Sequence, residues 1–401
     1  MRYNKDAVGD IAAVTSPPYD VMDRQMIDAL LQRHPSNIVR LILPRMITDP
    51  ATGGNAYERA ARRLERWRSR GVLATDDKRG LYVYEYGDAR HALCGLVGSV
   101  ELRAASERVI LPHEDVIAGI VADRFALMTT TSANLEPILL VYHGDGETAG
   151  VIDAVRAGTP LVDIDASDGS YHRVWALTDC EDLRVVREAL APRQALIADG
   201  HHRYAGYLQL RDRGSDARVN SVGGGTSVSS SPSPANSGLA LLIDDSQWPL
   251  QLGAIHRSIC EVTLSTLVGP AGLDVSEDVR LAGARPSTPT ARGSIVLTDG
   301  VYERVVNLGP PISGSSDAAV LHDVLLPAWG VGDDRLAYHH TVEQAVRTAS
   351  QDGGIAVLLH PTTVSEVMSL ARAGRTMPRK STSFGPKPRM GLVMRSFLDE
   401  L

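Results

Sequence analysis

The stretch that decides the fold is Ala195-Leu196-Ile197-Ala198-Asp199-Gly200-His201-His202-Arg203-Tyr204. Its apolar start predicts a strand, Gly200 predicts a close turn, and the residues that follow predict a helix capped by Asp199 and ending near Gly214. The first N–H groups of such a helix lack intrahelical acceptors and carry partial positive charge, and Arg203 adds a planar fork of donors. This arrangement suits an anion, above all a phosphate. The alternative is an ordinary capped helix with a polar surface.

The segments on both sides of this stretch predict an α+β fold. Upstream, apolar residues alternate over 80–110 and run together over 137–142, which predicts strands paired in a mixed sheet with few helices between them. Downstream, residues 215–238 are rich in Ser, Gly and Pro and predict a flexible loop. We therefore expect an N-terminal α+β region over 1–214, this loop, and a C-terminal α/β region over 239–401.

Composition is that of an ordinary globular protein, with 43% hydrophobic and 22% charged residues. The formal net charge of −7 argues against a general nucleic-acid binder, which needs a cationic surface. The N-terminus lacks a signal-peptide core and no apolar run reaches membrane-spanning length, so we expect a cytoplasmic protein without a membrane partner. The 3 cysteines have no paired spacing and predict neither disulfides nor a zinc site. The oligomeric state stays open.

Two acidic residues lie beside turns that proline restricts. The prolines hold Ser16-Pro17-Pro18-Tyr19-Asp20-Val21 extended, so Asp20 occupies a constrained turn where it could bind a metal or a substrate amine. Leu111-Pro112-His113-Glu114 precedes an expected helix whose N-terminus would hold Glu114, and a buried Glu beside a His can act as a general base. The alternatives are an Asx-type turn for Asp20 and a first-turn carboxylate favoured by the helix dipole for Glu114.

A second basic loop follows near the C-terminus. Met377-Pro378-Arg379-Lys380-Ser381-Thr382-Ser383-Phe384-Gly385-Pro386-Lys387 combines cations and hydroxyls with rigid prolines. Lysine neutralises phosphate charge and Ser or Thr donates hydrogen bonds to phosphate oxygens, so this loop could close on the same ligand as the first motif. The alternative is a solvated loop.

Several well-known motifs are absent from the sequence. It contains neither a P-loop nor a dinucleotide-binding glycine pattern, and it has no zincin His pair and no nucleophile elbow. What it offers is two anion-binding loops and several carboxylates. These match the needs of phosphoryl transfer, which are charge neutralisation, in-line positioning and a base for the acceptor hydroxyl.

An ordered set of motifs that spans nearly the whole chain resembles a bacterial and archaeal family known as domain of unknown function 1015 (DUF1015). The motifs are Ser16-Pro17-Pro18-Tyr19-Asp20-Val21, His34-Pro35 with Val39-Arg40-Leu41, Tyr57-Glu58-Arg59-Ala60, Leu111-Pro112-His113-Glu114, Ala198-Asp199-Gly200-His201-His202-Arg203-Tyr204, His256-Arg257 and Met377-Pro378-Arg379-Lys380-Ser381-Thr382.

The run Asp199-Gly200-His201-His202-Arg203 is also similar to the phosphate-binding element of the ParB and sulfiredoxin superfamily, which includes free-serine kinases. This resemblance implies a ParB/sulfiredoxin-like core and a kinase that transfers phosphate from ATP, ADP or pyrophosphate to free L-serine or a similar hydroxyl metabolite. Sulfiredoxin chemistry is disfavoured because His201 stands where that enzyme needs a cysteine. A non-catalytic protein that senses a nucleotide or a phosphate is the alternative.

These inferences assign roles to individual residues. The residues expected to hold the donor phosphate are Gly200, His201, Arg203, Lys380, Ser381, Thr382 and Lys387. The candidate catalytic residues are Glu114, His202 and Asp199, where Glu114 is the preferred base and Asp199 and Asp20 are its rivals. The candidate substrate-binding residues are Tyr19, Asp20, His113, Arg124 and Tyr204. The chemistry implies Mg²⁺, with Asp199 as a ligand.

Overall fold

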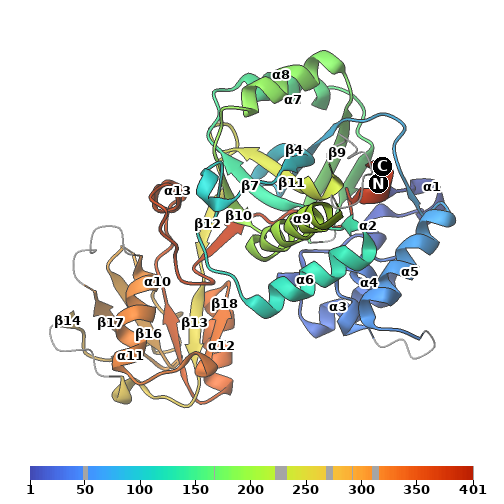
Figure 1. Cartoon of the computed structure of the whole chain (residues 1–401). Helices are drawn as coiled ribbons and strands as arrows, with labels where there is room; N and C mark the ends of the chain where they lie inside the picture. Colours follow the sequence, from blue (N-terminus) through green and yellow to red (C-terminus); the bar gives the residue numbers. More distant parts are fainter. Residues whose placement is uncertain are drawn as a thin grey trace. The chain divides into compact units, whose positions relative to one another are not determined.

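The computed structural model describes residues 1–47, 53–166, 168–221, 233–267, 274–290, 292–308 and 316–400. The chain forms two compact units, which are described separately (Figure 1). The larger unit comprises Met1–Pro112, Val116–Leu250 and Pro386–Leu401, and the smaller unit comprises His113–Asp115 and Gln251–Gly385. Within the described residues, no helix is long and apolar enough to cross a membrane.

A mixed sheet forms the centre of the larger unit, as the α+β prediction requires. Its strands pair in the order β5-β10-β7-β11-β4-β3-β9-β8. The pairs β5/β10 and β7/β11 are parallel, and the remaining neighbours are antiparallel. The strands are β3 (Leu81–Gly87), β4 (Ala92–Glu101), β5 (Ile110–Leu111), β7 (Ile138–Tyr142), β8 (Val162–Asp165), β9 (Tyr171–Leu177), β10 (Ala195–Asp199) and β11 (Ser237–Asp244).

Helices pack on this sheet in two groups. One group contains α5, α6 and α9, in which α6 packs against both of the others, and the second contains the neighbouring pair α7 and α8 (Figure 1). The helices of the unit are α1 (Lys5–Val8), α2 (Ile11–Val14), α3 (Arg24–Arg33), α4 (Val39–Ile42), α5 (Ala56–Ser69), α6 (Ala118–Thr131), α7 (Glu147–Arg156), α8 (Cys180–Leu190) and α9 (His201–Ser221). Short strand pairs β1 (Arg2–Tyr3) with β2 (Leu73–Ala74) and β6 (Ala133–Asn134) with β21 (Arg395–Ser396) complete the unit.

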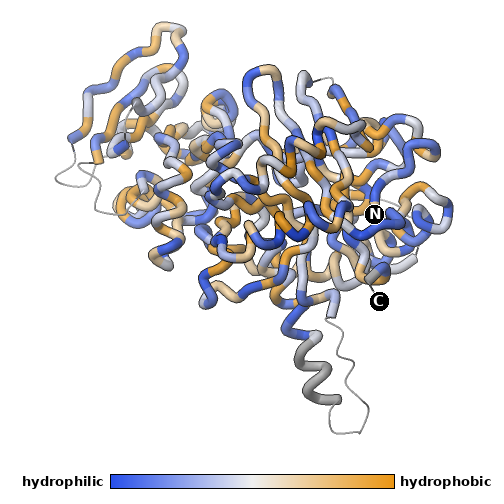
Figure 2. The backbone as a smooth tube through the Cα atoms, turned by 90° about the horizontal axis from the view of Figure 1, so that it is seen from above, coloured by the Kyte–Doolittle hydropathy of each residue, from blue (hydrophilic) through white to orange (hydrophobic). Residues whose placement is uncertain are grey.

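The core of the larger unit joins its central strands to α9. Ile138 and Leu140 of β7 belong to one buried cluster with Tyr204 and Tyr207 of α9. Every residue of β7 is buried, which is typical of a strand covered on both faces. Figure 2 shows hydrophobic segments of the tube gathered in the interior of this unit. The motif that follows β10 is therefore anchored by a buried hydrophobic cluster of the unit.

The smaller unit has its own sheet and core. Its strands pair in the order β14-β17-β16-β19-β13-β18, β15 also pairs with β17, and β12 pairs with β20. The strands are β12 (Gln251–Ala254), β13 (His256–Ile259), β14 (Asp274–Val275), β15 (Val279–Arg280), β16 (Ser294–Thr298), β17 (Tyr302–Asn307), β18 (Leu336–His339), β19 (Ile355–Leu358) and β20 (Thr382–Gly385). The helices are α10 (Asp317–Val320), α11 (Leu326–Ala328), α12 (Val342–Gln351) and α13 (Val364–Arg372), and a capping box at Thr363 begins α13.

The compact units divide the chain differently from the regions expected at 1–214, 215–238 and 239–401. Strand β11 lies in the middle of the larger sheet between β4 and β7, so residues just after 238 belong with the N-terminal region. Helix α9 continues past Gly214 to Ser221. Of the loop expected over 215–238, residues 222–232 lie outside the described residues.

Candidate functional site

The turn between β10 and α9 has the predicted form with one correction. Asp199 ends β10, and the Gly200 carbonyl accepts the N–H of Tyr204 at 2.9 Å, so Gly200 holds the N-cap position that was predicted for Asp199. Gly200 has a φ of +97°. A Cβ there would lie 2.8 Å from Cγ2 of Ile138 and 3.0 Å from Nε of Arg203, so the turn requires glycine.

Two cations hold the Asp199 carboxylate, one of them from α9 itself. Lys387 donates to Asp199 Oδ1 at 3.0 Å and also to Asp20. Arg203 forms an ion pair with Asp199 and donates to the Pro137 carbonyl at 2.6 Å. Burial disfavours the charged carboxylate, but Lys387 and Arg203 hold the pKa of Asp199 well below its usual value. Burial alone would lower the pKa of Lys387, but the contacts with Asp199 and Asp20 outweigh burial and raise it.

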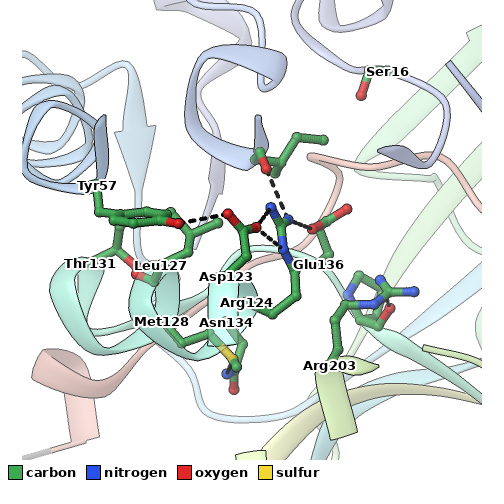
Figure 3. Close-up of polar contacts among 12 residues, drawn as sticks. Ser16, Tyr57, Asp123, Arg124, Leu127, Met128, Thr131, Asn134, Glu136 and Arg203 are labelled. Atoms are coloured by element: carbon green, nitrogen blue, oxygen red, sulfur yellow. Dashed lines mark hydrogen bonds and ion pairs between the residues drawn. The ribbon is translucent and has the colours of Figure 1, made fainter. Parts of the chain in front are cut away.

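A second group of charged residues lies near Arg203 (Figure 3). Arg124 pairs with Asp123 and with Glu136, whose oxygen lies 3.4 Å from Nη1 of Arg124, and Figure 3 shows Arg203 on the other side of Glu136. The Tyr19 ring centroid lies 4.8 Å from Cζ of Arg124 and 5.9 Å from Cζ of Arg203. Burial raises the pKa of Glu136 although both arginines oppose this. The sequence analysis missed Glu136, because no motif contains it and only its burial marks it.

Arg203 is enclosed on the side that faces Glu136. A cavity of about 20 Å³ lies there, lined by Arg124, Glu136, Arg203 and Tyr207 among others. Such a cavity has room for about one water molecule. The Arg203 side chain is only 4% exposed. Its ion pair with Asp199 therefore positions the Asp199 carboxylate and, through it, Lys387.

Two other residues predicted for the site, His202 and Tyr204, contact backbone groups, and a third, His201, is buried beside them in sequence. His202 Nε2 accepts the N–H of Ile117 at 2.9 Å. The Tyr204 hydroxyl accepts the N–H of Arg103 at 3.0 Å and donates to its carbonyl at 2.6 Å. His201 is buried, and burial lowers its pKa to about 4, so its ring is neutral at pH 7. His202 and Tyr204 thus fasten neighbouring segments to the start of α9.

The remaining predicted residues gather in the smaller unit. Glu114 accepts the N–H of Lys380 at 2.6 Å and the hydroxyl of Thr382 at 3.3 Å, and His113 Nε2 lies 2.9 Å from the same hydroxyl. Burial raises the pKa of Glu114 although these hydrogen bonds oppose it. Lys380 adopts a φ of +57°, an uncommon conformation for a residue with a side chain. The Ser381 hydroxyl is used within the loop, where it donates to the Pro378 carbonyl.

Glu114 does not occupy the helix start that was predicted for it. It forms a parallel bridge with Met377, and α6 begins only at Ala118. The pairing with Met377 keeps the chain extended at this point. A local sequence pattern cannot predict pairing with a residue so distant along the chain.

The structure thus brings the predicted residues together in two groups. The larger unit gathers Tyr19, Asp20, Arg124, Asp199, Arg203 and Lys387, and the smaller unit gathers His113, Glu114, Lys380, Ser381 and Thr382. A common phosphate site made by both loops stays a prediction, because the two groups belong to different units. Among the described residues, no group of three or more His, Cys, Asp or Glu side chains is placed to hold a metal ion.

Solved structures with weak similarity to the chain include kinases. A free serine kinase in complex with AMP has a TM-score of 0.40 at 15% identity, with 76% of this chain and 93% of that chain covered. A conserved hypothetical protein from Pyrococcus furiosus has a TM-score of 0.39 at 15% identity, covering 76% and 97%. SbnI with a C-terminal truncation, from Staphylococcus aureus, has a TM-score of 0.41 at 12% identity, covering 76% and 88%.

TM-scores of this size do not establish a shared fold, so the ParB/sulfiredoxin-like core stays a prediction. Among curated proteins, none matches the chain. The family model described as "Protein of unknown function (DUF1015)" matches residues 1–280, a segment that contains the turn after β10 and most of the larger unit. The chain therefore belongs to the DUF1015 family.

Proposed function

We propose that this protein is a small-molecule kinase that transfers phosphate from ATP, ADP or pyrophosphate to the hydroxyl group of free L-serine or a similar small metabolite. The observation that carries the proposal is the turn at Gly200, where a lysine from the far end of the chain is held beside the start of α9. A helix start and a fixed ammonium group together favour a phosphate.

The charges around Lys387 support a phosphate-binding role. A lysine ammonium group has three donors, and contacts with Asp20 and Asp199 account for two of them. The raised pKa of Lys387 keeps the group charged at neutral pH. In this arrangement Asp199 and Arg203 orient the lysine, and the lysine neutralises phosphate charge in the transition state.

Glu114 suits the role of base better than Asp199 does. A carboxylate with a raised pKa takes up a proton more readily, and burial gives Glu114 that property. The pKa of Asp199 is shifted the opposite way by its two cations. Asp20 also contacts Lys387 and is the other alternative to Glu114 as the base.

In the proposed reaction the acceptor hydroxyl oxygen attacks the terminal phosphorus of the donor. A new oxygen–phosphorus bond forms, the bond from phosphorus to the bridging oxygen breaks, and the leaving group is ADP, AMP or phosphate according to the donor. The hydroxyl proton passes to the base, for which we propose Glu114.

The residues present fit Mg²⁺ at Asp20 better than at Asp199. Asp20 Oδ1 is buried and has no hydrogen-bond partner in the part of the chain that the structure describes, whereas both Asp199 oxygens accept from cations. In proteins Mg²⁺ often uses one or two carboxylates together with substrate phosphates. When bound, it would supply charge neutralisation at the donor phosphates.

The test is phosphorus NMR of the full chain with L-serine, Mg²⁺ and each donor in turn, in which O-phosphoserine is the expected product. Lys387→Met should lower the rate by at least about 100-fold, in line with the loss of a transition-state charge contact. Lys5→Met removes an exposed lysine and serves as the matched control. If a donor raises the melting temperature but no product forms with any hydroxyl acceptor, the protein is the non-catalytic sensor and not a kinase.

A further inference from the structure

A cleft of about 220 Å³ opens in the larger unit next to the charges described above. Four segments that are distant in sequence line it: 17–21, 86–88, 168–172 and 386–389. Two of them also carry Asp20 and Lys387, so the cleft adjoins the turn at Gly200. Its volume is below the roughly 300–1,000 Å³ of pockets for drug-sized ligands, so it suits a small metabolite.

Tyr86 is the residue that indicates a ligand. It lines the cleft and its side chain is 0% exposed, yet its hydroxyl has no hydrogen-bond partner among the described residues. A buried polar group without a partner is unfavourable, because it has given up its hydrogen bonds to water. Burial raises the pKa of Tyr86 well above its usual value, so the hydroxyl keeps its proton and acts as a donor. This donor calls for an acceptor atom on a ligand.

Further lining residues specify the charge of that ligand. Lys387 brings an ammonium group and Asp168 brings a carboxylate into the lining of the same cleft. Four prolines, at positions 17, 18, 386 and 388, form much of the remaining wall. Proline has no N–H group and a fixed φ, so the wall is rigid and leaves polar recognition to the side chains. With Arg389 and Asp88, which also line the cleft, the lining holds two cations, two carboxylates and the neutral Tyr86 donor, and this balance of opposite charges matches a zwitterion.

A chain of hydrogen bonds holds Asp168 in place. The N–H of Arg389 donates to the Tyr84 hydroxyl at 2.9 Å, and the same hydroxyl lies 2.9 Å from His172 Nδ1. His172 Nε2 lies 3.2 Å from the Ser170 hydroxyl, which donates to Asp168 at 2.6 Å. Burial, with a smaller effect of Arg389, lowers the pKa of His172 to about 4, so its ring is neutral at pH 7. The carboxylate is thus fixed in advance of any ligand.

We propose that the cleft binds a small α-amino acid as its zwitterion, with Tyr86 and Lys387 directed to the carboxylate of the ligand and Asp168 directed to its ammonium group. The role of this ligand as phosphate acceptor rests on the proposed kinase function, while its binding does not. Lys387 joins the two sites, because it lines the cleft and contacts Asp199.

The test is calorimetric titration of the full chain with L-serine, L-homoserine and L-threonine in the absence of a phosphate donor. Tyr86→Phe keeps the ring and removes only the hydroxyl, so at least tenfold weaker binding is expected. Because that hydroxyl has no partner among the described residues, the variant should unfold at the same temperature as the wild type or higher. Tyr142→Phe is the matched control, since Tyr142 is equally buried but bonds to Thr148 away from the cleft, and it should leave affinity unchanged.

Two ligand analogues test the charges separately. L-Serine methyl ester lacks the carboxylate charge and N-acetyl-L-serine lacks the ammonium charge, and each should bind at least tenfold more weakly than L-serine. Absence of binding by all three amino acids at millimolar concentration would overturn the proposal, and so would wild-type affinity in Tyr86→Phe. If Tyr86→Phe transfers phosphate with an unchanged KM for serine, the cleft is not the binding site, but the kinase function stands. If the amino acids bind in a Tyr86-dependent way and no phosphate is transferred, the binding site stands and the kinase function is refuted.

Discussion

Lys387 links charges from three parts of the larger unit, and its contribution to stability is a direct consequence. Its ammonium group lies against two carboxylates that are each less than one-fifth exposed. Lys387→Met leaves Asp20 and Asp199 close together with one cation fewer. Removing one partner of a buried pair costs about 3–5 kcal/mol, so we expect a loss of about 3 kcal/mol, measured by urea denaturation at pH 7.

Lys387→Arg retains the positive charge, so its loss of unfolding free energy should be less than half that of Lys387→Met. Equal losses for the methionine and arginine variants would mean that the length of the side chain matters at this position and its charge does not.

Buried neutral histidines predict how stability depends on pH. The pKa values of His172 and His201 are lowered to about 4 by burial, whereas an unfolded histidine titrates near 6.5. Below about pH 6.5 the unfolded state therefore binds protons that the folded state does not, and stability should fall progressively as the pH drops from about 6.5 to about 4. Urea denaturation across this range measures the slope.

A single variant isolates one of these contributions. His172→Gln should flatten the slope, because the variant has no imidazole at this position to take up a proton on unfolding. A slope that is unchanged by His172→Gln would show that His172 already carries a proton in the folded state near pH 6.

At the scale of elements, the strand–turn–helix of β10 and α9 depends on one glycine. Gly200→Ala places a methyl group in a conformation with positive φ and in contact with Ile138 and Arg203. Positive φ alone costs about 1 kcal/mol and overpacking adds about 1–3 kcal/mol, so we expect a total loss of about 2–4 kcal/mol.

Gly71→Ala is the matched control for this prediction. Gly71 has a φ of +69° but nothing within 4 Å of an added Cβ, so it should lose only about 1 kcal/mol. Thermal denaturation of both variants compares them. Equal losses of stability in the two variants would mean that Ile138 and Arg203 move aside. The close packing at Gly200 would then not contribute to stability.

Elements whose causes are local were predictable from the sequence. Asp23, Asn55 and Thr363 cap their helices and belong to residue types that favour this position, and a cap depends only on residues within one turn. The cap predicted at Asp199 failed, since its carboxylate contacts Lys387, a residue 188 positions away. Glu114 differs from its prediction for the same reason, because it pairs with Met377. Long-range pairing of this kind leaves no pattern in a single sequence.

In the candidate site, too, local features were predictable from the sequence and long-range ones were not. The motif after β10 could be recognised from a continuous stretch of residues, and so could the basic loop that contains Lys380. The grouping of Asp20 with Lys387, and the presence of Glu136 and Tyr86, depended on how the strands assemble. Residue type alone does not distinguish a buried tyrosine without a partner from the other tyrosines of the chain.

For the whole molecule, the return of the chain to the larger unit after residue 385 predicts unequal stability of the two units. Met1 and Met394 exchange two hydrogen bonds, and Arg395 bonds to Asn134 and to the carbonyl of Ser237, the first residue of β11. A chain that ends at Gly385 loses these contacts, which brace the N-terminus and the end of the central sheet. It keeps every residue of the smaller unit.

Hydrogen exchange read by mass spectrometry separates the two units in this truncated chain. We expect β4 and β11 to lose protection while β16 and β19 retain it, because the latter strands pair only within the smaller unit. A full chain cut at a protease site inserted between Gly385 and Pro386 is the control. Its C-terminal segment should stay bound through the same hydrogen bonds and preserve protection in both sheets. Equal loss of protection in β16 and β19 of the truncated chain would instead mean that the two units unfold as one cooperative body.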